Sequence, residues 1–242
     1  MEDKLYIVIP AYNEEENIES CIRGWHHVVE QFGGPGSKLV VIDDGSKDGT
    51  LRKMQELQSV YPMLLPLTKP NGGHGPTVLY GYRYAIGQNA DWVFQTDSDG
   101  QTDPDEFPAF WEARSRADAV LGVREKRGDG AARKFVENTV CLLLRLIFGV
   151  KTKDANAPFR LMKTEVLKKY TGRLPIDFNL PNIMLTAYFL YYGEKTLFIP
   201  ISFKPRTAGK NSINIRKIMK IGWKALSDFR KLKRDIDADK KR

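Results

Sequence analysis

Short runs of apolar residues alternate with longer, helix-like segments through the first hundred residues of the chain. Residues 4–10 and 39–42 are continuous runs rich in β-branched residues, and residues 91–96 are interpreted as a third run of this kind. Such runs are typical of strands buried on both faces of a parallel sheet. Strands that alternate with helices predict a doubly wound α/β domain.

Two segments between these runs carry signals for the start of a helix. Asn13 followed by Glu16 forms an Asn-x-x-Glu capping box ahead of an apolar helical stripe. Asp103 is followed by Pro104, and proline is favoured at the first helical position. A further helix is expected over residues 76–86, after the glycine-rich loop NGGHG at 71–75.

The second half of the chain is less regular. Strands are expected at residues 118–123 and 196–203, and helices at residues 131–148, 180–192 and 213–236. The last helix is amphipathic, because its apolar residues recur every third or fourth position. We therefore predict a catalytic domain at residues 1–212 and a basic amphipathic helix and tail at residues 213–242.

Hydropathy, cysteine content and net charge indicate where the protein acts and which class of molecule it binds. No apolar run reaches eighteen residues, so no transmembrane helix is expected, and the N-terminus lacks the features of a secretory signal. The two cysteines, Cys21 and Cys141, are interpreted as reduced thiols of a cytosolic protein. The net charge is +8, and residues 216–242 hold eleven Lys or Arg against four Asp. This excess favours an anionic partner: nucleic acid, phospholipid or a phosphorylated substrate.

Polar and acidic residues follow each of the three strands at the point where the strand ends. The three segments are PAYNE at 10–14, IDDGS at 42–46 and DSDGQ at 97–101. In an open parallel sheet, ligands bind beyond the carboxyl ends of the strands. The sequence therefore predicts a binding site at this edge. Acidic tips repel phosphates unless a metal is present, so a non-enzymatic binder of nucleic acid or an anionic membrane is the least favoured hypothesis.

The third tip predicts a metal site. Asp97 and Asp99 lie two positions apart, Gly100 allows a tight turn, and Gln101 adds a neutral oxygen. Oxygen ligands of this kind suit Mg²⁺ or Mn²⁺, with substrate phosphates filling the open positions. A solvated turn or a helix cap is the structural alternative, but Asp103 already serves as the cap.

The second tip and the NGGHG loop allow both functional and structural interpretations. Asp43 or Asp44 could accept a hydrogen bond from a base or ribose. The alternative is a helix start capped by Ser46 or Asp48. In the loop, glycines could let the backbone approach a donor, or form an ordinary turn. His74 is interpreted as a local hydrogen-bonding residue rather than a metal ligand. Neither GxGxxG after the first strand nor GxxxxGK[ST] is present.

Together the segments VIPAYNEEENI, VIDDGSKDGT and QTDSDGQTDPDEF resemble the family 2 glycosyltransferases, in particular the branch with dolichyl-phosphate mannose synthase and bacterial polyprenyl-phosphate sugar transferases. The resemblance covers roughly residues 5–214. It implies the GT-A nucleotide-diphospho-sugar transferase fold, a mixed and mostly parallel sheet with helices on both faces. It also implies inverting transfer of a hexose from a GDP- or UDP-linked donor.

The resemblance also assigns residue roles. It places Pro10, Tyr12 and Glu14 in the nucleotide pocket, and Ile42 and Asp44 at the base. The metal and diphosphate segment is Asp97, Ser98, Asp99 and Gln101. Arg124 lies near the diphosphate and, with Arg133, near the acceptor phosphate, while Arg206, Gly209 and Lys210 belong to a segment that closes over the donor. The chain departs from the family pattern at residues 154–158 and at Ser212.

The acceptor decides whether the site needs a base. A sugar hydroxyl must lose a proton, for which Asp103 and Asp154 are weak candidates. A lipid phosphate is already anionic and needs only positioning cations, so the missing base favours a polyprenyl or dolichyl phosphate. We expect peripheral association with the cytoplasmic face of a membrane. For that contact, the helix at 213–236 and residues 135–150 are each either an interfacial element or part of the core.

Overall fold

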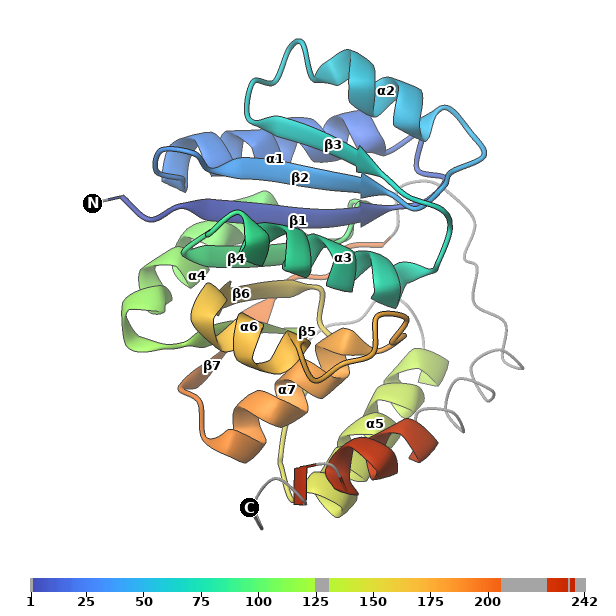
Figure 1. Ribbon diagram of the computed structural model, residues 1–242, viewed down its shortest axis with the longest axis vertical. Helices are drawn as coiled ribbons and strands as arrows, with labels where there is room; N and C mark the ends of the chain where they lie inside the picture. The colour runs from blue at the N-terminus through green and yellow to red at the C-terminus, as the bar shows by residue number, and fades with distance from the viewer. Residues whose placement is uncertain (1, 125–130, 206–225, 235, 238–242) are drawn as a thin grey trace.

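The fold is a seven-stranded mixed sheet with helices on both faces (Figure 1). The computed structural model describes residues 2–124, 131–205, 226–234 and 236–237. Within these residues the strand order is β3-β2-β1-β4-β6-β5-β7, and only β6 runs antiparallel to its neighbours. The strands are β1 (Leu5–Ala11), β2 (Lys38–Asp43), β3 (Leu64–Thr68), β4 (Trp92–Thr96), β5 (Ala119–Arg124), β6 (Phe159–Lys163) and β7 (Thr196–Ile201). The predicted mixed, mostly parallel α/β sheet is confirmed.

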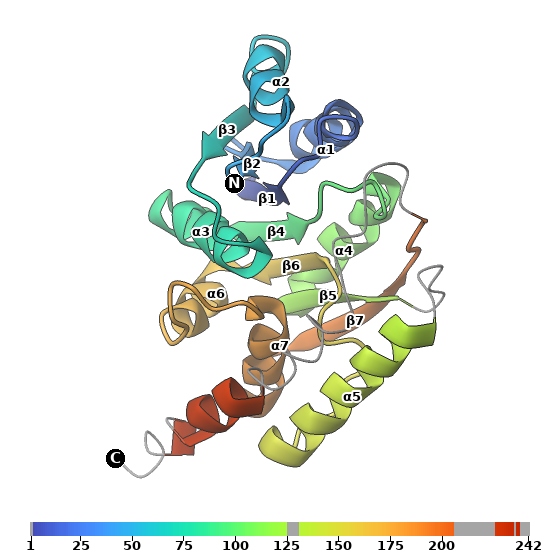
Figure 2. The same cartoon turned by 90° about the vertical axis from the view of Figure 1, so that its right-hand side faces the viewer.

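Helices cover the two faces of the sheet in separate groups (Figure 2). The helices are α1 (Ile18–Phe32), α2 (Thr50–Leu57), α3 (His74–Gly87), α4 (Phe107–Ala113), α5 (Ala131–Phe148), α6 (Thr164–Thr171) and α7 (Pro181–Tyr192), with 3-10 turns at Pro104–Glu106 and Arg114–Arg116. Apolar residues of α1 and α4 share one core cluster, and those of α3, α5, α6 and α7 share the other.

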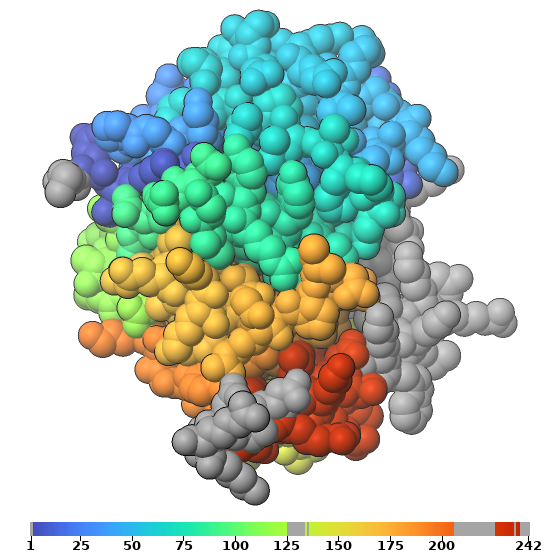
Figure 3. Space-filling model, viewed as in Figure 1, coloured from blue at the N-terminus to red at the C-terminus, as the bar shows by residue number. Residues whose placement is uncertain are grey.

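The continuous apolar runs arise because both faces of the central strands are buried. Ile7 and Ile9 belong to the cluster under α1, while Val8 belongs to the cluster under α3, and all three are fully buried. Gly81 lets α3 approach closely, since a Cβ there would lie 2.3 Å from Cγ1 of Val8. The space-filling view shows α3 and α6 as adjoining parts of one surface (Figure 3).

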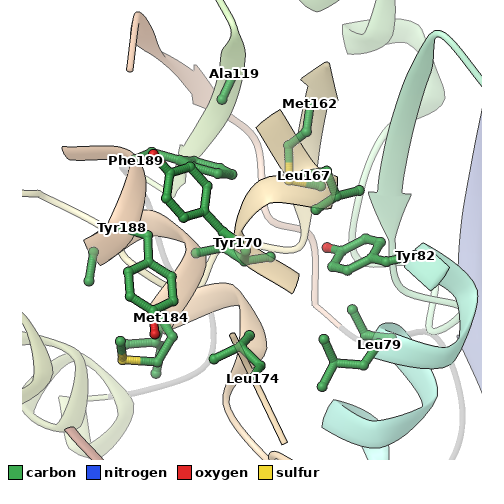
Figure 4. Packing of buried hydrophobic residues seen from close by; sticks show 14 of the residues in the cluster. Leu79, Tyr82, Ala119, Met162, Leu167, Tyr170, Leu174, Met184, Tyr188 and Phe189 are labelled. Carbon is green, nitrogen blue, oxygen red and sulfur yellow. The ribbon is translucent and has the colours of Figure 1, made fainter. Parts of the chain in front are cut away.

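Large side chains from three helices fill the cluster on the α3 face. Tyr82 of α3, Tyr170 of α6 and Tyr188 of α7 point toward a shared interior with Leu167 and Phe189 (Figure 4). The rings of Tyr170 and Tyr188 stack with their centroids 5.4 Å apart. This packing fixes α7 against α3 and α6.

The predicted capping box at Asn13 is wrong. Helix α1 begins at Ile18 with Asn17 at its N-cap, and Asn13 has a φ of 54°. The side-chain oxygen of Asn13 instead accepts a hydrogen bond from the backbone N–H of Lys47 at 2.8 Å. The loop after β1 is therefore held by the loop after β2 rather than by the helix start. The cap at Asp103 is confirmed, because its carboxylate accepts from the N–H of Asp105.

The apolar stripe near the C-terminus packs on the domain in the part that the structure describes. Phe229, Leu232 and Ile236 are buried in the cluster that contains α5 and α7, and the rings of Phe148 and Phe229 lie 6.2 Å apart. For residues 226–234 and 236–237 this favours the core interpretation over the interfacial one. Residues 213–225 of the expected helix lie outside the described residues, and the division at residue 212 stays a prediction.

Replacing Phe229 with Ala is expected to lower the free energy of unfolding by about 3–5 kcal/mol, because a large buried side chain leaves a cavity. Urea unfolding of both proteins measures this loss. Val60→Ala is the control: Val60 is 65% exposed, so its change should stay within about 0.5 kcal/mol. A loss for Phe229→Ala no larger than that of the control would contradict this packing.

Candidate active site

The tips of β1, β2 and β4 meet at one edge of the sheet, as the sequence predicted. These strands are parallel neighbours, so their carboxyl ends lie side by side. The hydroxyl of Ser98 donates to the carbonyl of Pro10 at 2.9 Å, which joins the tip of β4 to β1. The N–H of Asn13 donates to the hydroxyl of Ser46 at 2.9 Å, which joins the tip of β1 to β2.

The two carboxylates at the end of β2 are buried and hold neighbouring loops. Asp43 accepts from the hydroxyl of Thr68 at 2.9 Å and from the N–H of Ser46 at 3.0 Å. Asp44 pairs with Lys69 and accepts from the N–H groups of Gly72 and Gly73 at 2.9 and 2.8 Å. These bonds fix the glycine-rich loop beside the tip of β2, a structural role that the sequence did not reveal.

The proposed nucleotide-pocket residues differ in how much of each side chain reaches the surface. Tyr12 is 41% exposed, whereas Glu14 is 6% exposed and accepts a hydrogen bond from Asn17 at 2.7 Å. Ile42 is fully buried and would lie 2.7 Å from a Cβ added at Gly81, so its side chain belongs to the core. A contact from Ile42 to a base would therefore involve its backbone.

Asp97 presents one oxygen that is fixed and one that is open. Its Oδ1 accepts hydrogen bonds from Nε2 of Gln95 at 3.1 Å and from Nε2 of His74 at 2.9 Å. Its Oδ2 has no hydrogen bond among the described residues, and the side chain is 25% exposed. Two residues on, Asp99 is half-buried and accepts from the N–H of Gln101 at 3.1 Å.

The oxygen donors at this tip fit a divalent cation that takes its remaining ligands from a substrate. Among the described residues, no group of three or more His, Cys, Asp or Glu side chains could hold a metal without further ligands. The open oxygen of Asp97 fits Mg²⁺ or Mn²⁺, which bind one or two carboxylates together with phosphates.

His74 joins the glycine-rich loop to Asp97. It is the first residue of α3, and its side chain is 54% exposed. Desolvation lowers the pKa of His74, but the charge and hydrogen bond of Asp97, with the charges of Asp99 and Asp44, outweigh it and raise the pKa above 6.5. His74 is confirmed as a hydrogen-bonding residue, but the expectation of a local partner is wrong, because Asp97 lies 23 positions away in the sequence.

This shift predicts how stability depends on pH. Because the pKa of His74 is higher in the folded state, the protonated ring stabilises the fold below about pH 6.5, and this contribution is lost as pH rises through the raised pKa. Metal-free wild type should therefore exceed His74→Gln in unfolding free energy at pH 6, and the gap should shrink at pH 9. Exposed His27→Gln is the control. A gap that widens with pH would contradict the assignment.

Gln101 ties the end of β7 to the metal segment. Its side-chain amide donates to the carbonyl of Lys204 at 2.9 Å, and its own carbonyl accepts from the N–H of Lys204 at 2.8 Å. The ammonium of Lys204 bonds to Asp103 at 2.5 Å, and this hydrogen bond lowers the pKa of the Asp103 carboxyl. Residues 206–210, with the predicted Arg206, Gly209 and Lys210, lie outside the described residues, as does Ser212.

Arg124 ends β5 and is held in a buried ion pair with Asp154. Its Nε and Nη2 donate to the two oxygens of Asp154 at 2.7 and 2.9 Å, and Glu137 lies 3.7 Å from Nη2. The side chains of Arg124 and Asp154 are 8% and 2% exposed. Nη1 of Arg124 has no hydrogen bond among the described residues. The side chain of Arg133, the other predicted acceptor contact, lies outside the described residues.

Curated proteins similar to this chain act on polyprenyl phosphates, according to their names. The undecaprenyl-phosphate 4-deoxy-4-formamido-L-arabinose transferase of Pectobacterium carotovorum (strain PC1) is 25% identical over 91% of this chain and 66% of the relative. The polyprenol monophosphomannose synthase of Mycolicibacterium smegmatis is 28% identical over 88% of this chain and 83% of the relative. The chain thus spans a little less than two thirds of the first of these.

Solved structures share the fold at low sequence identity. Glucosyl-3-phosphoglycerate synthase of Mycobacterium tuberculosis, in complex with UDP, has a TM-score of 0.64 and 18% identity over 96% of this chain and 80% of that chain. The mannosyltransferase PcManGT of Pyrobaculum calidifontis, in complex with GDP-Man and Mn²⁺, has a TM-score of 0.57 and 18% identity over 83% and 55%. The model of the glycosyl transferase family 2 matches residues 6–171. The chain therefore belongs to glycosyl transferase family 2.

Proposed function

We propose that the chain transfers a hexose from a GDP- or UDP-linked donor to a polyprenyl phosphate, with inversion at the anomeric carbon. The observation that carries this proposal is the open carboxylate oxygen of Asp97 at the joined tips of β1, β2 and β4. Membership of glycosyl transferase family 2 and the similarity to polyprenyl-phosphate sugar transferases support it.

Asp97 and Asp99, with Gln101, would hold a Mg²⁺ or Mn²⁺ ion between the protein and the donor diphosphate. Held there, such an ion would supply positive charge against the negative charge that a departing diphosphate gains in the transition state. A solved structure of the same fold is a complex with Mn²⁺ and GDP-Man, and this supports the use of such an ion here. Asp44, Tyr12 and the backbone at Ile42 are proposed to contact the nucleoside.

The acceptor is proposed to be a phosphate because both candidate bases are already committed to cations. Asp103 pairs with Lys204, and Asp154 accepts two hydrogen bonds from Arg124. A carboxylate held by a cation is a weak base, whereas a phosphate acceptor has no proton to lose. Nη1 of Arg124, which has no hydrogen bond to any other described residue, is proposed to contact such a phosphate, and Arg133 follows at the start of α5.

Contact with a membrane surface is proposed for α5. This helix exposes Leu142 and Leu146, which are 54% and 72% exposed, with Arg145 between them. A helix with exposed apolar and basic side chains suits the boundary between headgroups and acyl chains. No helix of the described residues is long and apolar enough to cross a membrane. The exposed apolar and basic side chains of α5 support our proposal of peripheral association with the cytoplasmic face.

The proposal is tested by transfer assays with a panel of GDP- and UDP-linked hexoses and a short polyprenyl phosphate, with Mn²⁺, Mg²⁺ or EDTA. The expected result is a glycosylated lipid phosphate with one donor of the panel, formed only when metal is present. Metal-dependent hydrolysis of the donor without lipid product would contradict the acceptor and favour a glycan hydroxyl. Failure of every donor to bind or react would overturn the enzymatic proposal.

A further inference from the structure

A relay of three hydrogen bonds, two buried and the last part-buried, runs from α3 through α7 and β4 to Asp97. The hydroxyl of Tyr82 lies 3.0 Å from Oδ1 of Asn182, Nδ2 of Asn182 lies 2.8 Å from Oε1 of Gln95, and Nε2 of Gln95 lies 3.1 Å from Oδ1 of Asp97. Tyr82 and Gln95 are fully buried, and Asn182 is 2% exposed. Of the residues joined by these three hydrogen bonds, only Asp97 belongs to the proposed site.

The carboxylate of Asp97 determines which group donates and which accepts in each of these hydrogen bonds. An ionised carboxylate can only accept hydrogen bonds, so Gln95 must turn its NH₂ group toward Asp97. The amide oxygen of Gln95 then faces α7, and Asn182 must present its own NH₂ group there. The remaining oxygen of Asn182 accepts from the phenol of Tyr82. Burial raises the pKa of Tyr82, which keeps this donor protonated.

We propose that Asn182 is a positioning residue for metal binding, and that it acts on Asp97 through the orientation of Gln95. With Gln95 and His74 both donating to Oδ1, Asp97 is held so that its second oxygen stays open toward the substrate edge. The inference rests on the proposed function, in which that oxygen ligates the cation. Residues behind a metal ligand typically alter metal affinity by about 10- to 100-fold when they are replaced.

Reversing one amide in the middle of the relay separates this role from general packing. Asn182→Asp keeps the size of the side chain but, at a pH where the new carboxyl is ionised, places an acceptor oxygen against the oxygen of Gln95, so that Gln95 turns its own oxygen toward Asp97. Gln95→Met keeps most of the volume and removes the donor to Asp97. Both changes free Asp97 to rotate, so each is expected to weaken Mn²⁺ binding at least about tenfold.

The test measures Mn²⁺ binding in the presence of UDP or GDP, using the electron paramagnetic resonance signal of free Mn²⁺ as the readout. The unfolding temperature of each protein is measured alongside. Because both changes act through one relay, the double variant should bind Mn²⁺ no more weakly than Gln95→Met alone. Thr171→Val is the matched control, since Thr171 is 2% exposed and its hydroxyl bonds only to the carbonyl of Leu167 among the described residues. It should lower the unfolding temperature and leave Mn²⁺ affinity unchanged.

The outcomes separate the two proposals. If wild type binds no Mn²⁺ with either nucleotide, the proposed metal site fails. If wild type binds Mn²⁺ and folded Asn182→Asp binds it with unchanged affinity, the positioning role of Asn182 is overturned while the proposed function stands. If Asn182→Asp does not fold, Tyr82→Phe decides, with Tyr170→Phe as its control, because each removes one buried phenol hydroxyl. Only Tyr82→Phe should weaken Mn²⁺ binding, and equal affinities for these two variants would overturn the role.

Discussion

Replacing Asp99 with Asn is expected to lower the rate of sugar transfer by about a hundred- to a thousand-fold, a cost typical of removing one contact to charge that develops in the transition state. Asp99 lies in the segment that follows β4, two positions after Asp97, which presents the open oxygen. Asparagine keeps the shape of the side chain but removes the negative charge that attracts the cation. Initial rates across a Mn²⁺ titration measure the effect.

Asp105→Asn provides the control for this measurement. Asp105 is an exposed carboxylate six positions further along the chain, and it is not part of the proposed metal segment. Its replacement changes the net charge equally and should leave the rate within about twofold, as expected for a surface change. If the two variants lost similar activity, or if Asp99→Asn kept the wild-type rate at every Mn²⁺ concentration, Asp99 would have no role at the cation.

Replacing Asp154 with Ala is expected to lower the free energy of unfolding by about 3–5 kcal/mol, because it leaves the buried guanidinium of Arg124 without its carboxylate. The two side chains are 8% and 2% exposed, and two hydrogen bonds of 2.7 and 2.9 Å join them. Glu137, at 3.7 Å from Arg124, offsets only part of the charge. Denaturant unfolding at neutral pH measures the loss.

The surface pair of Lys163 and Glu165 gives a matched comparison. Its nitrogen and oxygen lie 3.6 Å apart, but the side chains are 44% and 84% exposed. Glu165→Ala removes a carboxylate of the same charge and should cost no more than about 1 kcal/mol. If Asp154→Ala cost as little as Glu165→Ala, the Arg124–Asp154 pair would not be a structural element of the site.

The sequence predicted the strands that carry the site because those strands are the most regular. Strands β3 and β6 were missed for physical reasons. Strand β3 lies at the edge of the sheet and contains Pro66, which a ladder tolerates only at an edge. Strand β6 contains Arg160, which is only 1% exposed and donates to the hydroxyl of Thr186 on α7. From sequence alone, an arginine indicates a loop or the surface, because the distant residue that accepts its hydrogen bond when it is buried is not known.

The candidate site was predicted where its residues are close in sequence and missed where they are distant. The tips of β1, β2 and β4 could be identified because the polar residues follow each strand directly. In contrast, the bonds from His74 and Asn182 reach across 23 and 87 positions. Spacing carries no signal for such partners. Asp154 was considered as a weak base, and only the structure shows it as the partner of Arg124.

The C-terminal stripe shows a further limit of periodicity. Apolar residues at every third or fourth position describe a helix that buries one face, and they do so equally for a membrane surface or a protein core. Phe229 and Ile236 are buried beside α5 and α7, a result that depends on the space left between those helices. Periodicity likewise does not tell which leucines of α5 are exposed. The exposure of Leu142 and Leu146 becomes known only once the neighbours of the helix are in place.

The central claim is that a phosphate is the acceptor at this edge of the sheet. The most direct measurement compares transfer from one nucleotide sugar, with Mn²⁺, to a polyprenyl phosphate and to the corresponding polyprenol, with products resolved by mass spectrometry. We expect addition of one hexose to the lipid phosphate alone, because the two candidate bases among the described residues, Asp103 and Asp154, are both paired with cations. Equal transfer to the alcohol, or transfer to a glycan hydroxyl with none to the lipid phosphate, would contradict it.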